Sequence, residues 1–129
     1  NGRELHLPLA ADCVALTDFN ELCGADLGPA DYLAIADNFH TLIICGIPRL
    51  GPESRDKAKR FVTLIDALYE NSVKLICSAE VRPSELYVKG EGAFEFERTA
   101  SRLIEMQSED YLYREHASQK DLKPCAKRL

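Results

Sequence analysis

Apolar residues recur along this chain with two spacings, one typical of strands and one typical of helices. Residues 41–47, within the stretch HTLIICGIPRL, and residues 73–79 (VKLICSA) are apolar runs with the length of a buried strand. Between them, residues 54–70 carry apolar residues at three- and four-residue intervals, which predicts a helix that Ser54 can cap. The apolar positions of this helix are Ala58, Phe61, Val62, Ile65, Leu68 and Tyr69. This order predicts a βαβ unit with two parallel strands and a right-handed crossover.

The residues before this unit predict an N-terminal β-hairpin and two short helices. Residues 3–9 alternate between apolar and polar positions and residues 13–17 are apolar, so we expect a hairpin over 4–17 with its turn at 10–12. Asp18 and Glu21 have the spacing of a capping box, and Gly24 is a suitable stop for the first helix. The second helix begins near Pro29. We expect it to turn four residues inward: Tyr32, Leu33, Ile35 and Ala36.

Residues 96–113 predict a long C-terminal helix. We expect Met106 at the margin of its buried face, which carries Leu103, Ile104, Gln107 and Tyr111. The tail, residues 117–129, has no periodicity and is expected to be flexible. The expected fold class is therefore α/β, with helices flanking the parallel strands and residues 1–116 forming one module.

The composition and charge of the chain limit which kinds of binding partner we expect. The 129 residues fit one domain, and the formal net charge is −5 with a pI near 5.2, which does not favour nucleic acid. No apolar run approaches the ~20 residues of a membrane span, so we expect no transmembrane segment. The five cysteines contain no CxxC pair, and the histidines are scattered, which predicts no metal site. We expect reduced, buried thiols and a cytoplasmic protein.

The ends of the two strands carry few groups for chemistry. In a parallel sheet, ligands gather at the carboxyl ends of the strands. Those ends present Gly46, Pro48 and Arg49 from one loop, and residues 78–80 from the other. His40, Ser78, Asp66 and Glu80 could be combined into a hydrolase site, but such residues occur in almost any domain of this size. No G-x-x-x-x-G-K-[ST] motif is present, so we do not expect this chain to hydrolyse ATP by itself.

Arg98 and Arg102 lie four residues apart and therefore share one face of the last helix. One interpretation is a clamp that reaches a phosphate or a neighbouring subunit, because the planar guanidinium suits phosphate oxygens. The other interpretation is pairing on a solvated face, and the spacing favours it. The available partners are Glu95, Glu97, Glu105 and Glu109. The same two interpretations apply to Arg55, Lys59 and Arg60, where Arg55 opposes the helix dipole.

Several long segments, in order, resemble the C-terminal part of the AFG-like P-loop ATPases, the family of the bacterial cell-division protein ZapE and its mitochondrial relatives. The resemblance covers residues 1–116. The segments are DFNELC, DYLAIADNFHTL, Ile-Pro, KRFVTLIDALYENSVKLICSAE and FEFERTASRLIEMQSEDYL. The positions that match the family's motifs are Asp31, Tyr32, Pro48, Arg60, Phe61, Asp66, Tyr69, Ser78, Arg98, Ser101, Arg102, Glu105 and Met106. Gly46 departs from the resemblance, because the family usually carries Asp or Asn there.

The resemblance implies an AAA-like ATPase that uses ATP and Mg²⁺ bound by an upstream P-loop domain. This chain would then be an expressed fragment, a truncated reading frame or a member without its motor half. Bacterial members are associated with the division site and FtsZ, and mitochondrial ones with protein quality control. The resemblance also implies homo-oligomers, with Arg98 and Arg102 as candidate phosphate-sensing residues. The alternative is a non-enzymatic module that binds a filament-forming or client protein.

Overall fold

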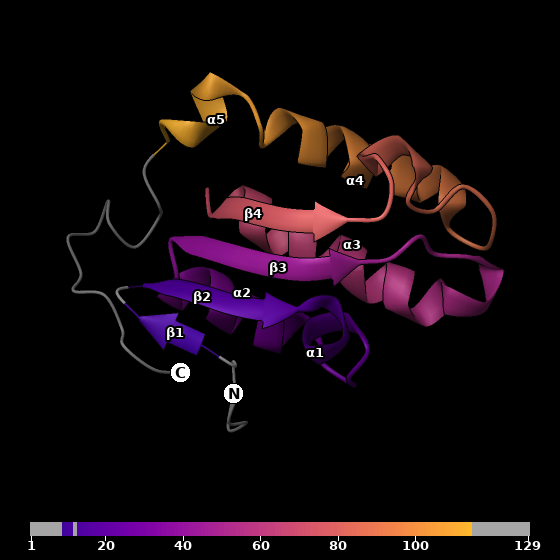
Figure 1. Cartoon of the computed structure of the whole chain (residues 1–129), viewed down its shortest axis with the longest axis horizontal. Helices are drawn as coiled ribbons and strands as arrows, with labels where there is room; N and C mark the ends of the chain where they lie inside the picture. The colour runs from indigo at the N-terminus through magenta and orange to yellow at the C-terminus, as the bar shows by residue number, and fades with distance from the viewer. Residues whose placement is uncertain (1–8, 12, 115–129) are drawn as a thin grey trace.

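The computed structural model describes residues 9–11 and 13–114, which form a four-stranded sheet with α2 and α3 behind it (Figure 1). The strands are β1 (Leu9–Ala11), β2 (Val14–Asp18), β3 (Thr41–Ile47) and β4 (Lys74–Ala79). The helices are α1 (Phe19–Cys23), α2 (Pro29–Asn38), α3 (Arg55–Glu70), α4 (Ala93–Glu105) and α5 (Glu109–Leu112). Two short 3₁₀ turns are η1 (Pro52–Ser54) and η2 (Pro83–Glu85). The expected flexible tail lies outside the described residues.

The sheet has the order β1-β2-β3-β4, in which β2, β3 and β4 are parallel and β1 is antiparallel to β2. This arrangement confirms the βαβ unit and the α/β class. The hairpin is confirmed for β1 and β2, but its turn comes later than expected, because residues 10 and 11 belong to β1 and Ala11 pairs with Val14. The earlier part of the expected first strand, residues 3–8, lies outside the described residues.

The sheet buries one face fully and the other only in part. Ala15, Leu42 and Ile44 are buried on the helix side. On the opposite side, Leu16 and Ile43 are only half-buried, and Ile76, in register with Ile43, is 58% exposed. The second strand of the unit, β4, is exposed from Ile76 onward because it lies at the edge of the sheet.

Helix α3 connects the sheet layer to the C-terminal helices. Its residues Phe61, Leu64, Ile65 and Leu68 are fully buried. The ring of Phe61 lies 5.9 Å from the ring of Phe19 in α1 and 6.1 Å from the ring of Phe96 in α4, measured between centroids. Of the expected inward positions in α3, Val62 and Tyr69 are only half-buried, whereas Leu64 was not expected and is buried.

The expected helix ends are largely confirmed. The Asp18 side chain accepts a hydrogen bond of 2.8 Å from the Glu21 amide, and Gly24 ends α1. Pro29 is the first residue of α2. Two expectations are wrong: Leu33 of α2 is 54% exposed, and Ser54 precedes α3 without a capping hydrogen bond from its side chain, because η1 leads directly into the helix.

The C-terminal helix is not continuous as expected. Helix α4 ends at Glu105, the chain turns, and α5 begins after Ser108, whose side chain accepts a hydrogen bond from the Tyr111 amide at 3.2 Å. The break brings Tyr111 into the core, where its hydroxyl donates to the carbonyls of Val73 (2.6 Å) and Leu68 (3.2 Å). It also removes two residues from the expected buried face, since Ile104 and Gln107 are exposed while Met106 is buried.

Gly46 occupies an irregularity in β3. The register with β4 shifts between Ile44 and Ile47, and Gly46 has a φ of +74°. A non-glycine residue adopts this left-handed conformation at a cost, which is least for Asn and Asp. The conformation thus accounts for both Gly here and the Asp or Asn that the resemblance implies.

Tyr111→Phe should destabilise the fold, because the buried Val73 carbonyl would lose its close donor, whereas the Leu68 carbonyl keeps the Val73 amide at 2.9 Å. We expect a loss of about 1–3 kcal/mol in the free energy of unfolding, measured by urea denaturation. Tyr113→Phe is the matched control, because Tyr113 is 84% exposed and should tolerate the change. Equal stability of the two variants would contradict the role given to the Tyr111 hydroxyl.

Substitutions at Gly46 should follow the cost of a positive φ rather than side-chain size alone. A Cβ at this position meets no atom within 4 Å, so the penalty is one of backbone conformation. We expect Gly46→Ala to lower the melting temperature, at a cost of about 1–2 kcal/mol, and Gly46→Asn to cost less. Thermal unfolding followed by circular dichroism tests this order, and a less stable Asn variant would contradict it.

Candidate functional site

Arg98 and Arg102 of α4 converge on one carboxylate, that of Asp66 in α3. Arg102 donates a short hydrogen bond to Asp66 Oδ1, and Arg98 Nη2 lies 3.5 Å from Asp66 Oδ2. The glutamates expected as partners on the arginines' own helix do not take this role. Neither of the two interpretations of the arginines from the sequence included Asp66 as their partner, because this contact depends on how α3 and α4 pack.

The two arginines differ in how firmly they are held. The Arg102 side chain is 22% exposed, and its guanidinium also stacks on the Tyr69 ring, 4.6 Å from the centroid. The Arg98 side chain is 65% exposed and has the longer contact. Arg102 is therefore part of the packing between α3 and α4, while Arg98 can reach a group outside the module without a large rearrangement. Sensing of phosphate by either residue stays a prediction.

A second group of polar and aromatic side chains continues from Tyr69 toward α5. The Tyr69 hydroxyl donates to Glu105 Oε2 at 2.7 Å, and Arg114 lies 3.3 Å from the same oxygen. The Arg114 guanidinium is also 5.1 Å from the centre of the Tyr111 ring. Burial raises the pKa of the Tyr111 hydroxyl, which keeps it a neutral donor. This group fastens α4 and α5 to α3 and leaves no evident place for a substrate.

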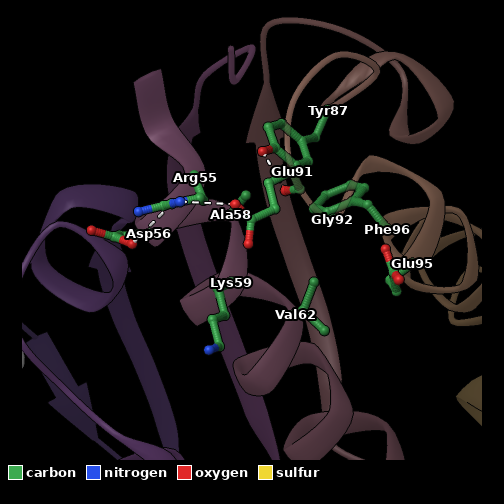
Figure 2. Close-up of a pocket in the computed structure, with 10 residues that line it drawn as sticks. All are labelled: Arg55, Asp56, Ala58, Lys59, Val62, Tyr87, Glu91, Gly92, Glu95 and Phe96. Carbon is green, nitrogen blue, oxygen red and sulfur yellow. Dashed lines mark hydrogen bonds and ion pairs between the residues drawn. The ribbon is translucent and has the colours of Figure 1, made fainter. Parts of the chain in front are cut away.

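A pocket of about 540 Å³ lies between the first half of α3 and the beginning of α4 (Figure 2). Arg55 crosses its mouth and donates to Glu91 Oε1 at 2.8 Å, while the Tyr87 hydroxyl donates to the Glu91 carbonyl at 2.6 Å. Lys59 and Glu95 also line it, together with the apolar side chains of Val62 and Phe96. The charges of both signs favour no single class of ligand. Arg60 lies elsewhere and donates to the Cys23 carbonyl at 3.1 Å.

The carboxyl ends of β3 and β4 meet, as expected, but their polar groups bind one another. The Gly46 amide donates to Ser78 Oγ at 2.8 Å, and the Arg49 amide donates to Glu80 Oε1 at 2.7 Å. His40 hydrogen-bonds Thr41 at 2.8 Å instead of meeting a serine. The hydrolase combination is therefore not assembled. Within residues 9–11 and 13–114, no group of three or more His, Cys, Asp or Glu residues could hold a metal ion.

The cysteines differ from the expectation of reduced, buried thiols. Cys23 is free and buried, and burial raises the pKa of its thiol to about 12. Cys45 and Cys77 are free but exposed, because β3 and β4 do not bury these positions. Cys13 is buried. Among the described helices, none is long and apolar enough to cross a membrane.

Comparison of the sequence with known proteins places this chain in a family. Cell division protein ZapE of Escherichia coli is 42% identical over 115 residues, which cover 86% of this chain and 31% of ZapE. Lactation elevated protein 1 homolog B of Danio rerio is 34% identical over an alignment of 142 positions, which covers 85% of this chain and 28% of that protein. The chain thus spans less than a third of the length of these curated relatives. No solved structure matches it. The family model of the AFG1-like ATPases matches residues 1–115, and the chain belongs to that family.

Proposed function

We propose that this chain is a C-terminal module of a ZapE-type, AAA-like ATPase that acts in bacterial cell division in the cytoplasm. Membership in the AFG1-like ATPase family and the likeness to a relative named for cell division support this proposal. The 129 residues contain no Walker A motif, so we assign the binding of ATP and Mg²⁺ to other parts of such an ATPase. The module alone does not hydrolyse ATP in this view, and contributes contacts to the P-loop domain, a neighbouring subunit or FtsZ.

Within this function, Arg98 is the arginine that reaches a phosphate or a neighbouring subunit, and Arg102 positions α4. The observation that supports this assignment is that the two arginines differ in exposure and in their distance from Asp66. Arg102 is largely buried against Asp66 and Tyr69, whereas Arg98 is mostly exposed. A guanidinium that neutralises charge on a transferring phosphoryl group can be worth ~10³–10⁵ in rate.

The two arginines should therefore respond differently to substitution. We expect Arg98→Ala, made at the aligned position of full-length E. coli ZapE, to lower ATP turnover by ~10³-fold with an unchanged melting temperature. Arg98→Lys should restore only part of the rate, because lysine keeps the charge but loses the planar set of donors. Arg102→Ala should instead lower the stability by about 1–2 kcal/mol, since it removes the close ion pair with Asp66 and the cation–π contact with the Tyr69 ring.

Turnover and thermal unfolding, measured on the same preparations, separate these effects. Lys59→Ala is a suitable control, because Lys59 is exposed and lies about two turns before Asp66 on α3. Unchanged turnover for the Arg98 variants would refute the role of Arg98, and a stable Arg102 variant would refute the positioning role of Arg102.

A second function, a non-enzymatic platform for a filament-forming partner, is favoured by an exposed apolar surface on α4 and the loop before it. Val88, Phe94 and Ile104 are all more than half exposed, and Phe94 reaches 79%. They border a hollow of about 520 Å³ whose other walls include Ala93, Ala100 and Phe96. Large exposed apolar groups that lie together commonly mark protein-binding surfaces.

Co-sedimentation of the 129-residue chain with FtsZ filaments, without ATP, tests this second function. The expected result for a platform is binding that Phe94→Asp and Ile104→Asp abolish. Leu33→Asp is the matched control, because Leu33 is similarly exposed but lies on α2. Failure to bind in the absence of ATP would exclude the platform and leave the ATPase module as the better function.

A further inference from the structure

The outer edge of β4 is open for most of its length. The strand pairs with β3 on one side and is last in the sheet order. Helix α5 covers only its beginning, through the hydrogen bond from Tyr111 to the Val73 carbonyl and a bond from Lys74 to the Arg114 carbonyl. In the described part of the chain, the backbone of residues 75–79 forms no hydrogen bond on the side away from β3. Unpaired strand edges of this kind readily accept another strand.

The surroundings of this edge are apolar on both faces of the sheet. On the helix side, Leu75, Cys77 and Ala79 line a groove of about 200 Å³ together with Leu103 of α4 and Met106, which follows α4. The surrounding apolar atoms raise the pKa of the Cys77 thiol. On the other side, Ile76 is more than half exposed. A strand added here would therefore find apolar contacts for side chains that alternate between the two faces.

Helix α4 lies where it would cover such a strand. Helices α2, α3 and α4 pack side by side in that order, and α4 runs alongside the outer edge of β4 (Figure 1). Packed helices are about 8–10 Å apart, roughly twice the spacing of neighbouring strands. The helix layer is consequently wider than the sheet at this end, and α4 passes beyond the last strand.

The edge also lacks the features by which proteins protect free edges. Residues 75–79 contain no proline and no charged residue, and the irregularity at Gly46 is in β3. Lys74, the one charge on the strand, has its ammonium bound to the carbonyls of Ser72 and Arg114. A bare apolar edge is an aggregation hazard unless a partner covers it.

We propose that β4 pairs with an extended segment of the same ATPase polypeptide, contributed by a part outside these 129 residues, which adds a fifth strand between β4 and α4. This inference rests on the proposed function, because the occupant belongs to the ATPase. The relatives have room for it, since the matched region is 31% of ZapE.

A second copy of this chain fits the edge less well. Antiparallel pairing of two β4 edges about a two-fold axis places both α4 helices on the same face of the joined sheet. Each helix, about 10 Å across, would then overlie the same seam between two strands about 4.8 Å apart. Because α4 extends beyond the last strand, there is room under it for a single added strand. In a symmetric pair the two α4 helices would overlap.

Amide hydrogen exchange, measured by mass spectrometry on the 129-residue chain and on full-length E. coli ZapE, tests the inference. The expected result is that the ZapE strand aligned with β4 exchanges about tenfold or more slowly than β4 in the 129-residue chain. The strand aligned with β3 is the internal control, because both of its neighbours are present in each protein.

A pair of ZapE variants sharpens the test. Lysine at the position aligned with Ile76 should bring the exchange of the edge strand back toward that of the 129-residue chain. Lysine at the position aligned with Leu33 is the matched control, because Leu33 has nearly the same exposure but lies on α2. This control should leave the exchange of the edge strand unchanged.

Two results would overturn the inference. One is equal exchange of the edge strand in both proteins. The other is slow, concentration-dependent exchange of β4 in the 129-residue chain together with a dimer in sedimentation, which would assign the edge to a second copy. Neither result depends on ATP turnover in the Arg98 variants. The inference can therefore fail while the role of Arg98 stands, and the reverse also holds.

Discussion

The buried face of α3 is the constraint on which the rest of the structure depends. Phe61, Leu64, Ile65 and Leu68 contribute roughly 1.5–3 kcal/mol each when fully buried, and α3 has more buried residues than any other described helix. Phe61 alone joins α1 and α4 through its ring contacts. The sheet, the N-terminal helices and the C-terminal helices thus share one core, organised along a single helix.

The same helix determines the chemistry of the arginines. Asp66 and Tyr69 lie on the side of α3 that faces α4, so the packing of the two helices sets which arginine they hold. Arg102 is one turn farther along α4 than Arg98 and meets both groups. Arg98 meets Asp66 only at the longer distance and keeps most of its surface in solvent. The position of the Asp66 carboxylate therefore holds Arg102 in the packing and leaves Arg98 available to another molecule.

The sheet of this module is covered unevenly at its two edges. The β1 side of the sheet ends in a hairpin, whereas the β4 side ends in an exposed apolar strand beside an apolar groove. Parallel strands bring their carboxyl ends to one edge, but here Ser78 and Glu80 satisfy the loop amides of Gly46 and Arg49. The module is thus better suited to contacts along its β4 edge and its α4 surface than to chemistry at its loops.

Much of this fold could be predicted from the sequence because it depends on local spacing. The boundaries of β3 and α3, the cap at Asp18 and the start of α2 at Pro29 follow from periodicity and from the backbone preferences of single residues. Local patterns were insufficient where a distant residue decides the outcome. Tyr111 breaks the C-terminal helix because its hydroxyl reaches two carbonyls about forty residues away in the chain. Asp66 binds the arginines only because α3 packs on α4, and Cys45 is exposed because no described element covers it. The sequence by itself determined which elements form. The tertiary structure alone decided which side chains meet and which strand edge stays open, because contacts between elements depend on how those elements pack.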